Sequence, residues 1–219
     1  MEKSFWLDKW QAKEIGFHLS DFHPLLQKYH LKVFSSSKSV FVPLCGKSHD
    51  MAFLASEKYR VTGSELSEIA AQEFFEEQKL LFGNTDYLIE NQRTHTSYRN
   101  DGCTIFTGDY FDLESTMLLG AENIYDRAAL IALPKEMRVR YVKQLKELLP
   151  QANMLLITLD YDQSVVSGPP FSVDEQEVNQ LFSFASIKQL YRQDIIEQEP
   201  RFMSKGLQSF NQTAYEIHW

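Results

Sequence analysis

The most informative residues are a glutamate and a tight turn, each placed where a predicted strand ends. The segment Val40-Phe-Val-Pro-Leu-Cys-Gly-Lys-Ser-His-Asp50 predicts a strand, a turn around Gly46 and the start of a helix. A second predicted strand, residues 60–65, ends at Glu65. In a doubly wound sheet, a carboxylate there can accept hydrogen bonds from two ribose hydroxyls. We therefore predict a nucleoside site, although a solvated loop carboxylate would leave the same pattern.

Two further polar positions follow predicted strands. Asp109 in Thr107-Gly-Asp-Tyr-Phe-Asp112 stands at the corner that lies beside adenine in nucleoside-binding sheets; otherwise it caps its own turn. Arg127 follows Asn123-Ile-Tyr-Asp126 at the rim where open α/β sheets bind ligands. Because apolar residues flank this guanidinium, it needs a partner, either Asp126 or a ligand anion.

Aromatic residues gather near the beginning of the chain. Trp6 and Trp10 are four residues apart, so they share one face of a predicted helix, and Phe17 follows. These rings predict either a helix that packs on the core or an aromatic lid over a flat or cationic ligand. Cys45 lies in the turn itself, and a role as nucleophile, with Lys47 and His49 nearby, stays open.

Strands alternate with helices along most of the chain, which predicts a doubly wound, mostly parallel α/β sheet. The N-terminal residues 6–31 are expected to be helical, with a break near Gly16 and Pro24. Asn100-Asp-Gly102 predicts the turn of a hairpin. The expected strands are 40–42, 60–65, 95–99, 103–107, 124–126, 153–160, 187–191 and 214–219, and the expected helices are 50–59, 67–81, 135–149 and 173–185.

Composition narrows the class of protein. A chain of 219 residues predicts a single domain, 1–219, with a helical lid over residues 1–35. The formal net charge of −8 argues against nucleic-acid and anionic membrane partners. The sequence has no apolar run long enough for a membrane span and no signal peptide at its start, so we expect a cytoplasmic protein. We also expect a monomer, since the strand edges carry no clear signal for self-association.

Other chemistries find little support. The six histidines show no metal-binding spacing, so we expect no metal, and His18 is expected to support the lid. Neither a Gly-x-Ser-x-Gly elbow nor a phosphate-binding Walker loop occurs. A nucleotide-dependent oxidoreductase would share the sheet, but Pro43-Leu-Cys-Gly46 lacks the first two glycines of a dinucleotide turn.

Taken in order, the motifs resemble the thiopurine S-methyltransferase family over nearly the whole chain. The motifs that carry the resemblance are Trp6…Trp10 with Gly16-Phe-His18, Val42-Pro-Leu-Cys-Gly-Lys-Ser48, Glu65-Leu-Ser67, Gly108-Asp-Tyr-Phe-Asp112, Tyr125-Asp-Arg-Ala-Ala-Leu130, Tyr161-Asp-Gln163 and Gly168-Pro-Pro-Phe171. The chain departs from the family pattern at Ser64, where an aliphatic residue more often precedes the glutamate, and at Phe53, where the family often has Trp.

The resemblance implies a class I methyltransferase fold, Rossmann-like, with a seven-stranded sheet whose last strand is antiparallel. It implies S-adenosylmethionine as the methyl donor, S-adenosylhomocysteine as the product, and a thiol on an aromatic heterocycle as the acceptor, with selenium and tellurium compounds as further acceptors. The residues it assigns to donor binding are Trp10, Leu44, Glu65, Asp109, Tyr110 and Arg127.

At the acceptor side the resemblance implies an aromatic position at Phe17, and Trp6 belongs to the same lid. Arg127 is the expected catalytic residue, and it either holds the donor carboxylate or stabilises the acceptor thiolate. The alternative function is a non-catalytic nucleoside-binding protein on a methyltransferase fold.

Overall fold

The structure, a computed structural model, describes residues 3–16, 18–35, 37–82 and 86–219. Its internal contacts group the chain into two compact units, Met1–Tyr125 and Asp126–Trp219. The expected single domain therefore stays a prediction. Among the described residues, every helix is too short or too polar to cross a lipid bilayer.

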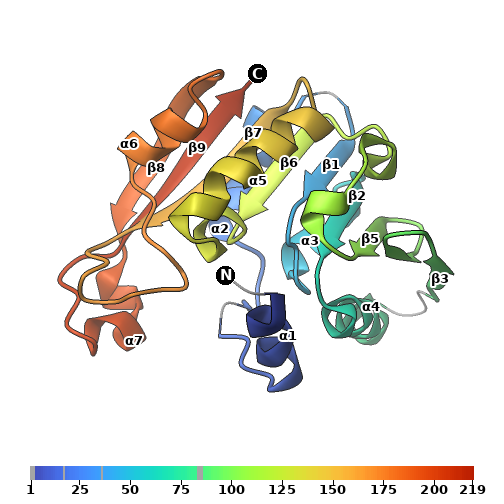
Figure 1. Cartoon of the computed structure of the whole chain (residues 1–219), viewed down its shortest axis with the longest axis horizontal. Coiled ribbons are helices and arrows are strands. Elements are labelled where there is room, and N and C mark those ends of the chain that lie inside the picture. Colours follow the sequence, from blue (N-terminus) through green and yellow to red (C-terminus); the bar gives the residue numbers. More distant parts are fainter. Residues whose placement is uncertain (1–2, 17, 36, 83–85) are drawn as a thin grey trace. The chain divides into compact units, whose positions relative to one another are not determined.

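The first unit begins with two helices, alternates strands and helices from β1 to α4, and continues with a run of strands (Figure 1). Its elements are α1 Lys3–Gln11, α2 Pro24–Val33, β1 Ser39–Val42, α3 His49–Ser56, β2 Arg60–Glu65, α4 Glu68–Phe82, β3 Leu88–Asn91, β4 Thr96–Arg99, β5 Cys103–Thr107 and the start of β6 Asn123–Arg127. Short 3-10 turns at Tyr110–Asp112 and Ser115–Leu118 link β5 to β6.

The sheet of this unit is parallel at its centre. β1 pairs in parallel with β2 and with the start of β6, and β2 pairs in parallel with β5. All four residues of β1 and all five of β5 are buried, as expected for strands that are covered on both faces. Since parallel strands end at the same edge, the segments after β1, β2 and β5 meet there.

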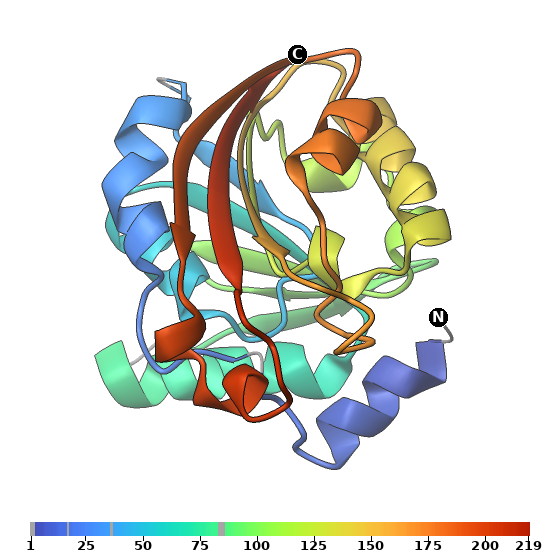
Figure 2. The same cartoon turned by 90° about the vertical axis from the view of Figure 1, so that its left-hand side faces the viewer.

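The second unit contains an antiparallel part of the sheet (Figure 2). Its remaining elements are α5 Lys135–Leu148, β7 Asn153–Asp160, α6 Glu175–Leu181, β8 Ser186–Asp194, α7 Pro200–Met203 and β9 Asn211–His218, with 3-10 turns at Leu130–Ala132 and Ile196–Gln198. β9 runs between β7 and β8 and is antiparallel to both. The expected antiparallel last strand is thus confirmed.

The expected fold class, an α/β fold with a mostly parallel central sheet, is confirmed, with differences in detail. The described residues form nine strands where the resemblance implied seven. The additional strands are β4, predicted from the hairpin turn, and β3, which the sequence did not indicate. All four residues of β3 are exposed, so it lacks the apolar alternation that predicts a half-buried strand. The helix expected over 173–185 is shorter, Glu175–Leu181.

Candidate active site

The turn after β1 folds back onto the end of β2. The amide of Cys45 donates to the Ser64 carbonyl at 2.8 Å, and the amide of Leu44 donates to the Ser64 hydroxyl at 3.2 Å. Leu44 has a φ of 45°, a left-handed conformation that costs a non-glycine residue about 1–2 kcal/mol. Ser64, the departure from the family pattern, therefore helps to hold this strained turn.

Gly63 in β2 lets the turn approach the strand. A Cβ atom at residue 63 would lie 2.7 Å from Cys45 Sγ and 3.0 Å from Met51 Cε. Burial, followed by the nearby Glu65 carboxylate, raises the pKa of the Cys45 thiol well above its usual value. A catalytic nucleophile needs the thiolate form. The arrangement therefore favours a packing role for Cys45 over the nucleophilic role that the sequence left open.

We expect Gly63→Ala to lower the free energy of unfolding by about 2 kcal/mol, because a methyl group is forced into a filled core. Cys45→Ala in the same chain should recover about half of that loss by removing the clashing sulfur. Urea unfolding of the two single variants and the double variant measures the coupling. Strictly additive effects would show that the Cys45 side chain does not determine the requirement for glycine.

Glu65 is held by the backbone on both sides of its carboxylate. Oε2 accepts a hydrogen bond from the Gly46 amide at 2.8 Å, and Oε1 accepts one from the Ser67 amide at 2.9 Å. The residue is only 6% exposed, and this burial raises the pKa of its carboxyl group, while the amides of Ser67, Gly46 and Leu66 oppose the rise. A carboxylate offers about four acceptor sites, more than these amides fill, which leaves capacity for a ribose hydroxyl.

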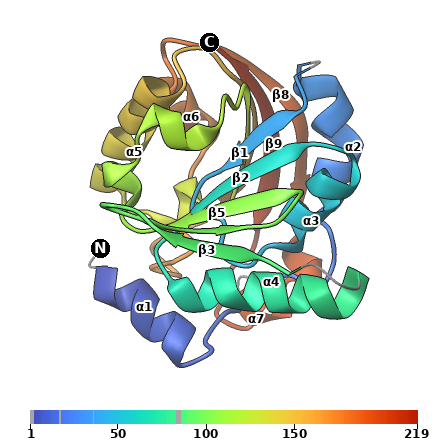
Figure 3. The same ribbon diagram turned by 90° about the vertical axis from the view of Figure 1, so that its right-hand side faces the viewer.

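Trp10 covers the turn from α1. It is 4% exposed, and its ring carbon Cζ2 lies 3.2 Å from the point where a Cβ of residue 46 would stand, so Gly46 leaves room for the ring. Trp6, on the same helix, is half-buried, and its ring meets Phe5 edge-on at 5.2 Å. α1 lies beside α4 in this unit (Figure 3). Phe17 lies outside the described residues.

The corner after β5 is tied to the end of β2. The Gly108 amide donates to the Glu65 carbonyl at 2.9 Å. Asp109 Oδ1 accepts from the Phe111 amide at 3.0 Å, and Oδ2 pairs with Lys3 Nζ of α1 at 2.6 Å. Asp109 thus caps its own turn, as the simpler interpretation expected, and Tyr110 beside it is buried. Contact of either residue with adenine stays a prediction.

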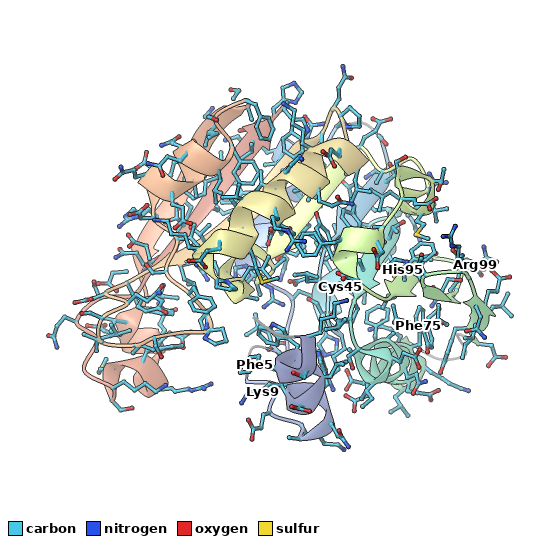
Figure 4. All side chains as sticks on the ribbon, viewed as in Figure 1. Phe5, Lys9, Cys45, Phe75, His95 and Arg99 are labelled. Carbon is cyan, nitrogen blue, oxygen red and sulfur yellow. The ribbon has the colours of Figure 1, made fainter. Side chains whose placement is uncertain are left out.

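Two residues that the sequence did not single out support this edge of the sheet. His95 Nε2 donates to the Asp109 carbonyl at 3.1 Å, and the His95 side chain is labelled near the hairpin in Figure 4. Asp50 accepts from the His23 amide at 2.7 Å and from the Tyr125 hydroxyl at 2.9 Å. The only sequence signal for Asp50 is its place in the first turn of α3, next to the capping Ser48.

Arg127 closes β6 and belongs to the second unit, where it is half-buried. Asp126, one partner considered for it, accepts hydrogen bonds from the Ala129 and Leu130 amides and from the Tyr141 hydroxyl, the last at 2.7 Å. These bonds fix the turn after β6, in which Ala128 has a φ of 80°. The role of Arg127 stays a prediction.

Comparisons with known proteins identify the family of this chain. A family model described as thiopurine S-methyltransferase matches residues 1–218. A thiopurine S-methyltransferase of Vibrio atlanticus is 48% identical over 216 residues, 97% of this chain and 96% of that protein. One of Shewanella pealeana is 43% identical over 220 residues, 99% and 98% of the two chains.

Solved structures resemble this fold at low sequence identity. A methyltransferase dependent on S-adenosylmethionine from Anabaena variabilis has a TM-score of 0.65 at 15% identity, covering 99% of this chain and 95% of that one. Magnesium protoporphyrin IX methyltransferase from Synechocystis, with bound S-adenosylhomocysteine, has a TM-score of 0.62 at 12% identity and covers 98% of each chain. From its family match and its relatives, this chain belongs to the thiopurine S-methyltransferase family and is a methyltransferase.

Proposed function

We propose that this methyltransferase moves a methyl group from S-adenosylmethionine to the sulfur of a small aromatic thiol of the thiopurine type. The observation that carries the proposal is the buried carboxylate of Glu65 at the end of β2. Its two oxygens accept hydrogen bonds from the backbone amides of Gly46 and Ser67. The turn at Leu44–Gly46 lies against it, and Trp10 packs over that turn. The names of the relatives support the choice of a thiopurine acceptor.

The residues would divide the work of donor binding. Glu65 would accept hydrogen bonds from the ribose hydroxyls, Asp109 and Tyr110 would border the adenine, and Leu44 and Trp10 would shield the sulfonium end from water. When bound, S-adenosylmethionine supplies a methyl group on a positive sulfur that leaves as a neutral thioether. The protein therefore has chiefly to align the two substrates and exclude water.

The acceptor side calls for aromatic surface more than for a strong base. Aromatic thiols ionise near neutral pH, so the attacking thiolate needs little help with deprotonation. Trp6 and Phe17 would contact the flat acceptor. Selenols and tellurium compounds, which are soft and polarizable, would be further acceptors. A monomer in the cytoplasm, without nucleic-acid or membrane partners, remains our expectation.

Arg127 has two candidate roles that one variant separates. If the guanidinium holds the donor carboxylate, Arg127→Gln weakens binding of S-adenosylhomocysteine in calorimetry. If it stabilises the thiolate, product affinity stays unchanged, while the pH profile of kcat/KM for the thiol moves to higher pH. We expect one of these two changes; a variant that resembles the wild type in both would remove Arg127 from the reaction.

The lid role of α1 is tested at its ion pair with Asp109. Lys3 is largely exposed, so this pair contributes less than about 1 kcal/mol to stability. We expect Lys3→Gln to speed dissociation of S-adenosylhomocysteine about two- to fivefold in stopped-flow measurements, with little change in unfolding. Lys9→Gln is the matched control, since Lys9 of the same helix forms an ion pair with nearby Glu14. Equal rates in both variants would contradict a lid that Lys3 holds closed.

Activity itself is tested with purified protein, S-adenosylmethionine and 6-mercaptopurine. We expect S-methylated product by mass spectrometry and none from hypoxanthine, which carries oxygen in place of the sulfur. A selenol and tellurite extend the acceptor panel. Binding of S-adenosylhomocysteine without product from any acceptor would favour the alternative, a non-catalytic nucleoside-binding protein.

A further inference from the structure

We propose that His18, His49 and Glu77 form a binding site for a divalent transition metal such as Zn²⁺. One ligand atom from each of the three side chains lies within 4.8 Å of the other two. The residues come from the segment between α1 and α2, from the first turn of α3 and from α4. All three belong to the first unit. Two imidazoles and one carboxylate are a ligand set that Zn²⁺ takes with a water in the fourth position.

The two imidazoles and the carboxylate lie close together. The ring centroids of His18 and His49 are 5.0 Å apart, with their planes inclined by 43°. His49 Nε2 lies 4.0 Å from Glu77 Oε2, which is too long for a hydrogen bond. Ligand atoms around a tetrahedral zinc lie about 3.3 Å apart, given metal–ligand distances near 2 Å. The ligand atoms therefore need to approach one another by up to about 1.5 Å, which rotamer adjustments can supply.

Glu77 presents one oxygen that the protein leaves without a hydrogen bond. Its Oε1 accepts from Lys47 Nζ at 2.6 Å, whereas its Oε2 is buried and has no hydrogen-bond partner among the described residues. An unpartnered buried carboxylate oxygen is unfavourable, because it has lost its water without gaining a hydrogen-bond donor. A metal ion beside Oε2 would satisfy that oxygen without disturbing the bond from Lys47.

The local charge also favours a cation. Lys47 Nζ lies 2.8 Å from Glu73 Oε2 as well as 2.6 Å from Glu77 Oε1, so one ammonium faces two carboxylates. With both histidines neutral, as metal binding requires, the cluster carries one net negative charge. Glu73 thus balances Lys47, and Glu77 is left to balance the metal. A water ligand has access, because the Glu77 side chain as a whole is about one-third exposed.

The position of the site gives metal binding a structural consequence. His18 lies in the segment that leads from α1 to α2, and His49 follows three residues after Gly46 of the candidate donor turn. A metal ion would cross-link the segment after α1 to α3 and α4. We therefore expect Zn²⁺ to stabilise the fold and to hold this N-terminal segment in place.

The proposal is tested by titrating Zn²⁺ alone into the full chain after treatment with EDTA. We expect one ion per chain in calorimetry, a raised thermal midpoint on addition of Zn²⁺, and a visible Co²⁺ spectrum of tetrahedral type. His18→Gln, His49→Gln and Glu77→Gln should each weaken Zn²⁺ binding at least about tenfold. If one variant fails to fold without metal, the other two give the answer.

Two controls distinguish ligands from nearby charges and from other histidines. His218→Gln removes an exposed histidine of β9 and should leave Zn²⁺ affinity unchanged. Glu73→Gln removes a neighbouring charge but no ligand, so its loss of affinity should be smaller than that of Glu77→Gln. The proposal is overturned if the wild type binds no Zn²⁺, or if binding survives unchanged in His49→Gln and Glu77→Gln.

Discussion

Glu65→Gln is expected to weaken binding of S-adenosylhomocysteine about 10- to 100-fold. One carboxylate oxygen becomes an amide NH₂ group, which cannot accept a hydrogen bond from a ribose hydroxyl. Hydrogen bonds to a charged group contribute about 1.5–3 kcal/mol each, which corresponds to this change in affinity. Isothermal titration of the product into folded variant and wild type measures it directly.

The same substitution has a structural cost that must be kept separate. In the wild type the amides of Gly46 and Ser67 both donate to the carboxylate. In the variant the new NH₂ group faces one of these amides, so two donors oppose each other. We therefore expect a loss of about 1–2 kcal/mol in unfolding free energy, and affinity is to be measured well below the thermal midpoint.

Glu68→Gln is the matched control for this variant. It makes the same chemical change three residues along the chain, at an exposed position that opens α4, and should bind product like the wild type. Product affinity of Glu65→Gln within twofold of the wild type would rule out Glu65 as the anchor of the ribose.

Local pattern was enough to predict the part of the site that lies next to strand ends. Residues 60–65 form a strand with the bounds expected, buried from residue 61 onward, and its terminal carboxylate accepts a hydrogen bond from the Gly46 amide. A charge at the end of an apolar strand needs partners, and the chain can supply them only where neighbouring parallel strands also end. The strand bounds and the position of Glu65 therefore followed from one signal.

Residues whose partners are distant along the chain could not be predicted in this way. Asp50 accepts hydrogen bonds from the His23 amide, 27 residues before it, and from the Tyr125 hydroxyl, 75 residues after it. His95 bonds a carbonyl 14 residues away, and in the sequence it is one more polar residue at the start of a hairpin. The His18, His49 and Glu77 cluster has no motif spacing at all. Such contacts depend on the order of strands, which spacing alone does not specify.

Asp126→Asn is expected to remove a pH dependence of about 3 kcal/mol from the stability of this protein. Burial raises the pKa of the Asp126 carboxyl group from 3.8 to about 6, against the lowering effect of the bonds from Tyr141, Leu130 and Ala129. The folded state therefore binds this proton more tightly than the unfolded state. The resulting stabilisation is complete below the unfolded pKa and is lost as pH rises through about 6, and two pKa units amount to about 3 kcal/mol.

The test compares urea unfolding of wild type and variant between pH 5 and 7. Over that range Asp126 should add about 1 kcal/mol to the wild type on acidification, and the variant should lack this gain. Asp101→Asn, at the exposed hairpin turn, is the control and should follow the wild type. Parallel curves for wild type and Asp126→Asn would mean that Asp126 does not titrate in this range. The same carboxylate also accepts the amide hydrogen bonds that fix the turn after Arg127. If Asp126→Asn loses the pH dependence but keeps the stability of the wild type at pH 7, this turn does not need the negative charge.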